Sequence, residues 1–250
     1  MGDKGTIVSQ TMNAPANAAG LRQIPVLLRG EPDAINEWIQ RWDVRRVLLY
    51  LMVIFAGAGS YGAAMGWWRD PQQAVYAAIK FPLVILLTTF GNALLNAMLA
   101  PLLGLNLAFR QSLLAMLMSF TIASAILGAF SPLIFFIVLN APPLQPGVAV
   151  PANTYFMIQL TQVAVIAFAG IAANLRLLQL LRRLGGSVPV ARKVLCAWLG
   201  GNFLLGTQLV WILRPFIGLP NLPVEFLRPN AFEGNFFETV FHSVINLFTF

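Results

Sequence analysis

Two side chains near the C-terminus have the types and spacing of an acid–base pair. Glu238 and His242 are four residues apart, which places both on one face of a helix. A carboxylate and an imidazole can transfer protons, but no nucleophile or oxyanion-stabilising donor accompanies this pair. A surface hydrogen bond or ion pair is the simpler interpretation. The chain holds 1 histidine and 1 cysteine, so zinc sites of the finger or metalloprotease type are excluded, and we expect no enzymatic activity and no cofactor.

The other candidates for chemistry are neutral amides inside long apolar runs. Amides in hydrocarbon seek hydrogen-bond partners, which predicts contacts between helices or, as the alternative, a neutral polar path through an uncoupled channel or facilitator. The apolar runs contain no Asp, Glu, Lys, Arg or His, which argues against ion-coupled transport and intramembrane acid catalysis. The amides are Asn92, Asn96, Gln159, Gln162, Asn202 and Gln208.

The elements that must position these amides are five apolar runs long enough to cross a bilayer. Of all residues 58% are hydrophobic and 10% are charged, a composition with which a soluble domain could not cover its core. About 20 apolar residues in a helix span a hydrocarbon core of roughly 30 Å. We therefore predict an all-α, polytopic transmembrane helix bundle over 47–213. Its five spans are 47–68, 81–103, 112–139, 155–175 and 194–213.

The third run leaves the number of spans open. As a single straight helix it would be about 42 Å long, more than one crossing needs. Pro132 lacks a backbone N–H and disfavours helix at Ser131, so we predict one span with a kink near Pro132. A tight hairpin within this run, which would make six spans, is the alternative.

Small residues recur at intervals of four within the predicted spans. This spacing puts them on one helix face and lets two backbones approach closely in lipid, which predicts a compact bundle. The sets are Ala58, Gly62 and Gly66; Ser124 and Gly128; Ala169 and Ala173; and Ala197 and Gly201.

The positions of lysine and arginine predict the orientation, because these residues are retained on the cytoplasmic side. With the N-terminus inside, the cytoplasmic segments hold most of the 16 Lys and Arg residues. We therefore predict a multi-pass protein of a bacterial inner membrane, with a cytoplasmic N-terminus and a periplasmic C-terminus. Its net charge of +7 then lies mostly beside anionic lipid, and we expect no nucleic-acid partner.

Both ends of the chain are predicted to add elements outside the spans. Residues 1–30 are small and polar and are expected to be flexible, and 31–46 should form an amphipathic interfacial helix. Residues 214–250 should form an aromatic-rich exoplasmic tail with a second amphipathic helix. Exposed aromatic surface is typical of interaction sites. The predicted partner contacts are Trp38, Trp42, Trp211, Arg214, Phe232, Phe237, Phe241 and Phe248.

The segment Gly104-Leu-Asn-Leu-Ala-Phe109-Arg110-Gln111, between the second and third spans, carries a family resemblance. With five spans behind a soluble N-terminal segment, it resembles the Yip1 family over roughly 47–213, the tail excepted. This resemblance implies a membrane-organising or partner-binding role and no catalytic residue. The run Trp211-Ile-Leu-Arg-Pro-Phe216 is also similar to uncharacterised bacterial inner-membrane proteins.

Together these observations predict a non-enzymatic membrane protein. We expect a scaffold or an accessory or assembly subunit of a membrane complex, surrounded by the lipid bilayer. Its partner would be another membrane protein or a second copy of this chain.

Overall fold

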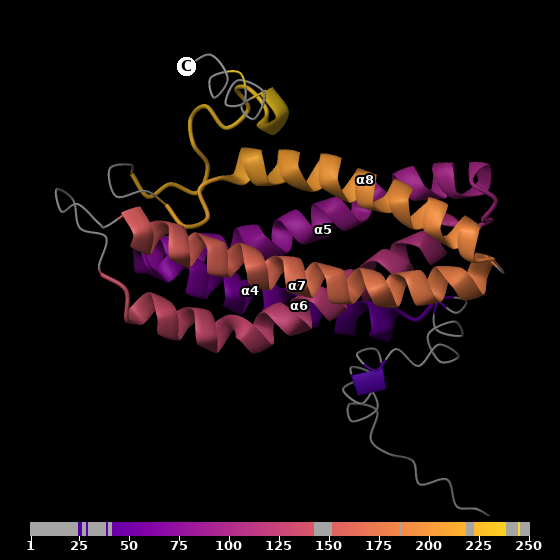
Figure 1. Ribbon diagram of the computed structural model, residues 1–250, viewed down its shortest axis with the longest axis horizontal. Helices are drawn as coiled ribbons and strands as arrows, with labels where there is room; N and C mark the ends of the chain where they lie inside the picture. The colour runs from indigo at the N-terminus through magenta and orange to yellow at the C-terminus, as the bar shows by residue number, and fades with distance from the viewer. Residues whose placement is uncertain are drawn as a thin grey trace, which may run out of the picture.

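Five long helices run side by side in the described part of the chain (Figure 1). The structure is a computed structural model and describes residues 25–26, 29, 39, 42–142, 152–185, 187–218, 223–238 and 245. Each of the five helices is long and apolar enough to cross a membrane, which confirms the predicted all-α bundle and indicates a multi-pass membrane protein. The helices are α4 (Val44–Trp67), α5 (Pro71–Leu102), α6 (Phe109–Leu139), α7 (Ala152–Gly185) and α8 (Val188–Leu213).

Helix α5 begins earlier than its apolar run. The Asp70 carboxylate caps the helix by accepting a hydrogen bond from the backbone N–H of Gln72 at 2.7 Å. Pro71 follows in the first turn, where no backbone N–H is needed. The charge-free run starts the second span at 81 and leaves Lys80 in a loop, whereas the structure places Lys80 inside α5 with 0% of its surface exposed. The predicted lack of ionisable side chains therefore does not hold for the whole of this helix.

Helix α6 continues through Pro132 as one helix, so the hairpin alternative with six spans is wrong. A proline leaves the carbonyl four residues before it without an N–H partner. In α6 that carbonyl belongs to Gly128, and the Ser131 hydroxyl donates a hydrogen bond to it at 2.8 Å. The serine thus compensates for the missing N–H, and the helix passes the proline without a break.

Glycines bring α4 into backbone contact with both α5 and α6. A Cβ atom added at Gly66 would stand 2.6 Å from the backbone oxygen of Gln73 on α5. One added at Gly128 of α6 would stand 2.8 Å from the Cα atom of Gly57 on α4. Residues Gly62, Gly66 and Gly128 belong to the predicted small-residue sets, whereas Gly57 does not. Only residues without side chains permit these distances between helices.

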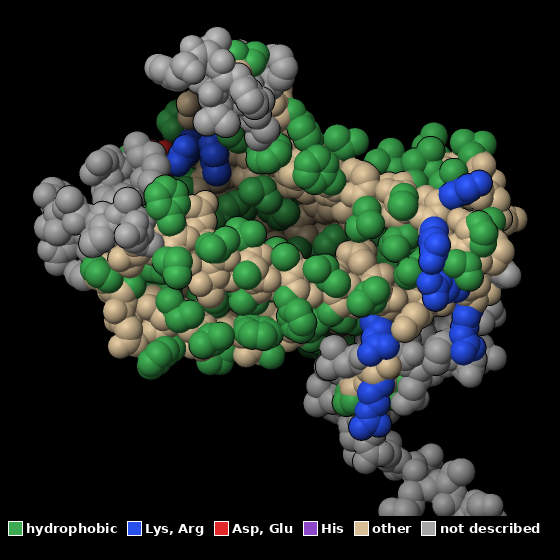
Figure 2. All heavy atoms as spheres, in the orientation of Figure 1, with side chains coloured by type: hydrophobic (Ala, Val, Ile, Leu, Met, Phe, Trp, Pro, Cys, Tyr) green, Lys and Arg blue, Asp and Glu red, His purple; other side chains and the backbone are tan. Residues whose placement is uncertain are grey.

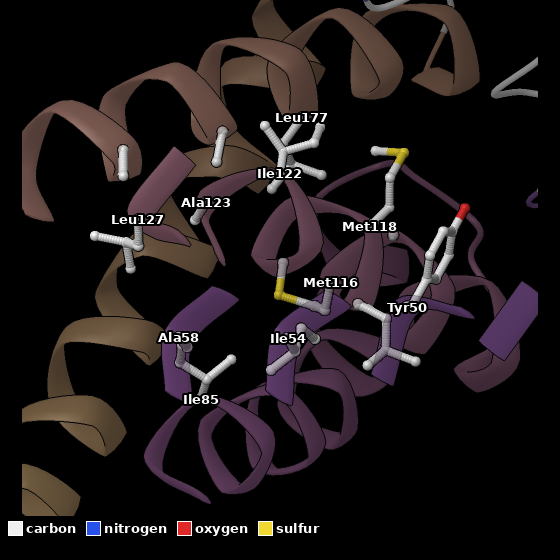
Figure 3. Packing of buried hydrophobic residues seen from close by; sticks show 14 of the residues in the cluster. Tyr50, Ile54, Ala58, Ile85, Met116, Met118, Ile122, Ala123, Leu127 and Leu177 are labelled. Carbon is white, nitrogen blue, oxygen red and sulfur yellow. The ribbon is translucent and has the colours of Figure 1, made fainter. Parts of the chain in front are cut away.

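Buried apolar side chains from neighbouring helices pack together in the core of the bundle (Figure 3). Ile54 and Ala58 extend from α4, Met116 and Ile122 from α6, and Leu177 from α7, and none is more than 3% exposed. In a membrane protein, this dense packing stabilises the bundle through van der Waals contacts, because lipid tails are as apolar as the side chains.

Helix α8 completes a ring with α5, α6 and α7. It packs mainly against α5 and α7, while α4 lies outside the ring against α5 and α6. The first half of α8 is anchored by Trp198 and Gly201, which are both buried. In contrast, no residue from 202 to 212 is buried. The second half of α8 therefore leaves space at the centre of the ring.

Candidate functional site

A cavity of about 690 Å³ lies between α5, α6, α7 and α8. Figure 2 shows this face of the bundle hollowed between α7 and α8, with mostly hydrophobic side chains around the hollow. The volume falls within the range of about 300–1,000 Å³ that is typical of ligand pockets. Because the hollow opens between two helices, a ligand would enter from the side of the bundle, where lipid surrounds a membrane protein.

The wall formed by α7 changes from polar to apolar along the helix. Tyr155 lies near the start of α7, Gln159 and Gln162 follow, and Ile166 and Gly170 line the far part. At 1.5 Å per residue these positions extend over about 22 Å, from one end of the helix to its middle. A Cβ atom added at Gly170 would meet no atom of the described residues within 4 Å, so the cavity has open space there.

Gln162 is the buried polar group of this wall. It is 2% exposed, and neither polar atom of its side chain has a hydrogen-bond partner among the described residues. Its backbone is held in place, because the Tyr61 hydroxyl of α4 donates to the Gln162 carbonyl oxygen at 3.0 Å. Buried amides are normally paired in proteins. This side chain is therefore suited to bind a carbonyl or hydroxyl group of a ligand.

Two arginines line the cavity where it reaches the end of the bundle. Arg214 directly follows α8; its guanidinium lies 3.4 Å from the centroid of the Trp211 ring and donates to the Trp211 carbonyl oxygen at 2.9 Å. Arg228 comes from the segment after α8. Burial lowers the pKa of Arg214, and the positive charge of Arg228 lowers this pKa further. Among the described residues, no carboxylate forms an ion pair with either guanidinium.

A buried lysine and a buried glutamine hold the chain after α8 against α5. Lys80 Nζ donates to the carbonyl oxygens of Pro215 at 3.1 Å and Glu225 at 3.4 Å. Gln73 Nε2 donates to the carbonyl oxygens of Pro215 and Phe216, each at 2.9 Å. Because Pro215 and Phe216 line the cavity, these hydrogen bonds position part of its lining. Neither Lys80 nor Gln73 is among the site residues predicted from sequence.

Known proteins give no guide to this cavity. Comparisons of the chain with protein-family models, curated proteins and solved structures found no match. The resemblance to the Yip1 family stays a prediction, and the function is inferred from the residues of the cavity.

The predicted amides divide into two groups. Gln159 and Gln162 line the cavity, whereas Asn92 lies between α5 and α8. The Asn92 Nδ2 atom donates to Asn202 Oδ1 at 2.6 Å and to the Trp198 carbonyl oxygen at 3.0 Å. This second group therefore connects two helices. Asn96 is fully buried one turn after Asn92, and Gln208 is half-buried on α8; neither lines the cavity.

The aromatic tail partly covers α8. The Phe237 ring packs on the Phe203 ring of α8, with centroids 5.8 Å apart, and Trp211 Nε1 donates to the Glu233 carbonyl oxygen at 3.4 Å. Phe232, in contrast, is 77% exposed. Among the predicted partner contacts, Trp38, Phe241 and Phe248 lie outside the described residues, as does His242 of the predicted acid–base pair.

Lys and Arg side chains gather at the end of the bundle where α4, α6 and α8 begin (Figure 2). Trp42 lies at this end, 44% exposed, with the Arg110 guanidinium 6.0 Å from its ring centroid. The opposite end holds fewer described basic residues, namely Arg69, Lys80, Arg214 and Arg228. The two ends of the bundle thus differ in charge.

Proposed function

We propose that the protein is a non-enzymatic membrane protein that binds a lipid-like amphiphile between its helices and serves as an accessory subunit of a membrane complex. The observation that carries this proposal is the lateral cavity, whose wall passes from polar residues at the bundle end to apolar residues at its middle. An amphiphile has the same order of groups. The surrounding bilayer supplies such molecules at high local concentration.

Binding is favoured over catalysis by the chemistry of the cavity. Its polar side chains are those of Tyr155, Gln159, Gln162, Arg214 and Arg228. These can donate hydrogen bonds and attract an anion, but they lack the paired nucleophile and base that acyl or phosphoryl transfer requires.

An uncoupled channel or facilitator is the alternative function. It would need a continuous polar path that joins the two ends of the bundle. Gln159 and Gln162 would supply one part of that path, whereas Asn92 is occupied by Asn202 away from the cavity. A hydrogen bond between α5 and α8 explains the buried amide of Asn92 more simply. Such a contact stabilises a pair of membrane helices by roughly 1 kcal/mol.

Filling the cavity tests the proposed function. Replacing Gly170 with phenylalanine puts a ring where a Cβ meets no other atom, so the variant should fold and lose about tenfold in lipid affinity. Lipid retained by the purified chain can be measured by native mass spectrometry after mild detergent extraction. The matched control is Ala167→Phe, one turn earlier at an exposed position of α7 that does not line the cavity. Equal lipid retention by the two variants would contradict the proposal.

The accessory role predicts that the exposed tail contacts another membrane protein or a second copy. Phe232 offers exposed aromatic surface there. Deleting 231–250 should therefore reduce the size of the complex that is extracted from native membranes, measured by pull-down and size-exclusion chromatography. A chain that is a lone monomer with and without this segment would exclude the accessory role.

The orientation that we propose is a cytoplasmic N-terminus and a periplasmic C-terminus in a bacterial inner membrane. It is supported by the gathering of basic residues at the end where α4 begins. Alkaline phosphatase, which is active only after export, should be active when fused to the C-terminus and inactive when fused after Gly185, the last residue of α7. The reverse pattern of activity would show the opposite orientation.

A further inference from the structure

The cavity extends through one half of the bundle. Helix α7 begins and α8 ends at the same end of the bundle, and the lining residues run from Tyr155 near that end to Gly170. Their extent of about 22 Å equals half of a bilayer about 40–45 Å thick, headgroups included. The cavity therefore has the depth of one leaflet, with Arg214 and Arg228 at headgroup level.

The arginines give this headgroup position a positive charge. A guanidinium has five N–H donors, and Arg214 uses only some of them for the Trp211 carbonyl oxygen. Stacking on the Trp211 ring also limits the rotation of Arg214. Because Arg214 and Arg228 are both half-buried, line one cavity and repel each other, a bound anion would offset their repulsion. Arginine binds phosphate with short, charge-assisted and often bidentate hydrogen bonds.

Gln162 occupies the level between the arginines and the apolar wall. Its buried amide has no hydrogen-bond partner within the described ranges of the chain, and it lies about 10 Å further along α7 than Tyr155. In a glycerophospholipid, the ester carbonyls lie between the phosphate and the acyl chains. The amide N–H of Gln162 can donate a hydrogen bond to such a carbonyl. A simple fatty acid has no second carbonyl below its headgroup and cannot make this contact.

We propose that the ligand of the cavity is an anionic glycerophospholipid, with its phosphate at Arg214 and Arg228, an ester carbonyl at Gln162 and an acyl chain along α7 towards Gly170. This assignment rests on the proposed function and adds the ligand class and the recognition of the headgroup. It also selects one leaflet, the one at the end of the bundle where α8 ends.

Two phospholipids with the same phosphate but with an anionic and a zwitterionic headgroup test the assignment. We would titrate the full chain in detergent with phosphatidylglycerol and phosphatidylcholine of identical acyl chains and measure both affinities by native mass spectrometry. The wild-type chain should bind phosphatidylglycerol about tenfold more tightly, because the choline cation of phosphatidylcholine would be repelled by the two arginines that bind the phosphate. Arg228→Gln should reduce this preference, because only Arg214, on Trp211, remains to attract the anionic headgroup. The matched control is Arg192→Gln, an exposed arginine at the opposite end that should leave the preference unchanged.

The outcomes separate the assignment from the function on which it rests. Equal binding of both lipids by the wild-type chain, or an unchanged preference in Arg228→Gln, would overturn the headgroup assignment and leave lipid binding intact. If palmitate binds as tightly as phosphatidylglycerol, the assignment of the ligand as a glycerophospholipid is wrong. If neither phosphatidylglycerol nor phosphatidylcholine binds, the proposed function itself is wrong. If Arg228→Gln does not fold, the salt dependence of lipid affinity in the wild-type chain tests the same headgroup recognition. Added salt should weaken the binding of phosphatidylglycerol only.

Discussion

The Gly57→Ala variant should unfold about 6 °C below the wild-type chain, although only one methyl group is added. A Cβ atom at Gly57 would overlap the backbone carbonyl of Ser124 on α6. A backbone carbonyl in a helix cannot turn away as a flexible side chain can, and Gly128 of α6 already faces Gly57 closely. The two helices must therefore separate, at a cost of about 3 kcal/mol, which exceeds the roughly 1 kcal/mol by which alanine favours a helix.

The matched control for this variant is Gly200→Ala. Gly200 also lies within a helix, α8, but a Cβ atom there would meet nothing within 4 Å. Alanine at this position should leave the unfolding temperature unchanged or raise it slightly. Thermal unfolding in detergent, followed by circular dichroism, compares the two. Equal shifts for Gly57→Ala and Gly200→Ala would refute the close contact between α4 and α6.

The Lys80→Met variant is expected to free the chain after α8 from α5. Methionine keeps most of the side-chain volume but removes the hydrogen bonds to the carbonyl oxygens of Pro215 and Glu225. It also removes the ammonium group that lies 5.2 Å from the Phe226 ring centroid. Losing these contacts of a charged donor costs about 2 kcal/mol, so the detached form should become about 30-fold more populated.

Limited proteolysis measures this detachment, because cleavage follows the population of the open form when opening is fast. Chymotrypsin should cut after Phe216 or Phe226 about 30-fold faster in Lys80→Met, and lipid binding should weaken because Pro215 and Phe216 line the cavity. Lys193→Met, at an exposed position of α8, serves as the control and should be cut at the wild-type rate. An unchanged rate in Lys80→Met would mean that other contacts hold this segment.

The beginning of α5 shows what the apolar runs alone did not predict. Asp70 followed by Pro71 is the pattern of an N-cap and first helical residue, and it predicts a helix from 71. With that start, Gln73 and Lys80 fall on one helix face, two turns apart. The second span was predicted from the absence of charge, so its predicted start lies directly after Lys80. A capping signal located the helix better than hydropathy did.

The site residues were predicted unevenly for a related reason. Gln159 and Gln162 were recognisable as amides in an apolar run, but nothing nearby in the sequence distinguishes them from Asn92, which pairs with Asn202 instead. Which amide faces a cavity and which faces a helix depends on the rotation of each helix in the bundle. Arg228 and Gly170 carry no local signal at all, because one lies in the segment after α8 and the other is a glycine among many.

The sequence by itself determined that the chain forms five apolar helices and that basic residues collect at one end, because helix length, hydropathy and charge are local properties of the chain. Only the tertiary structure decided that Gln162, Gly170 and the two arginines surround one cavity. That arrangement depends on the space beside the second half of α8, whereas Trp198 and Gly201 anchor the first half on α5. The distance between two helices is set by the contacts of side chains far apart in the sequence, and no local pattern contains it.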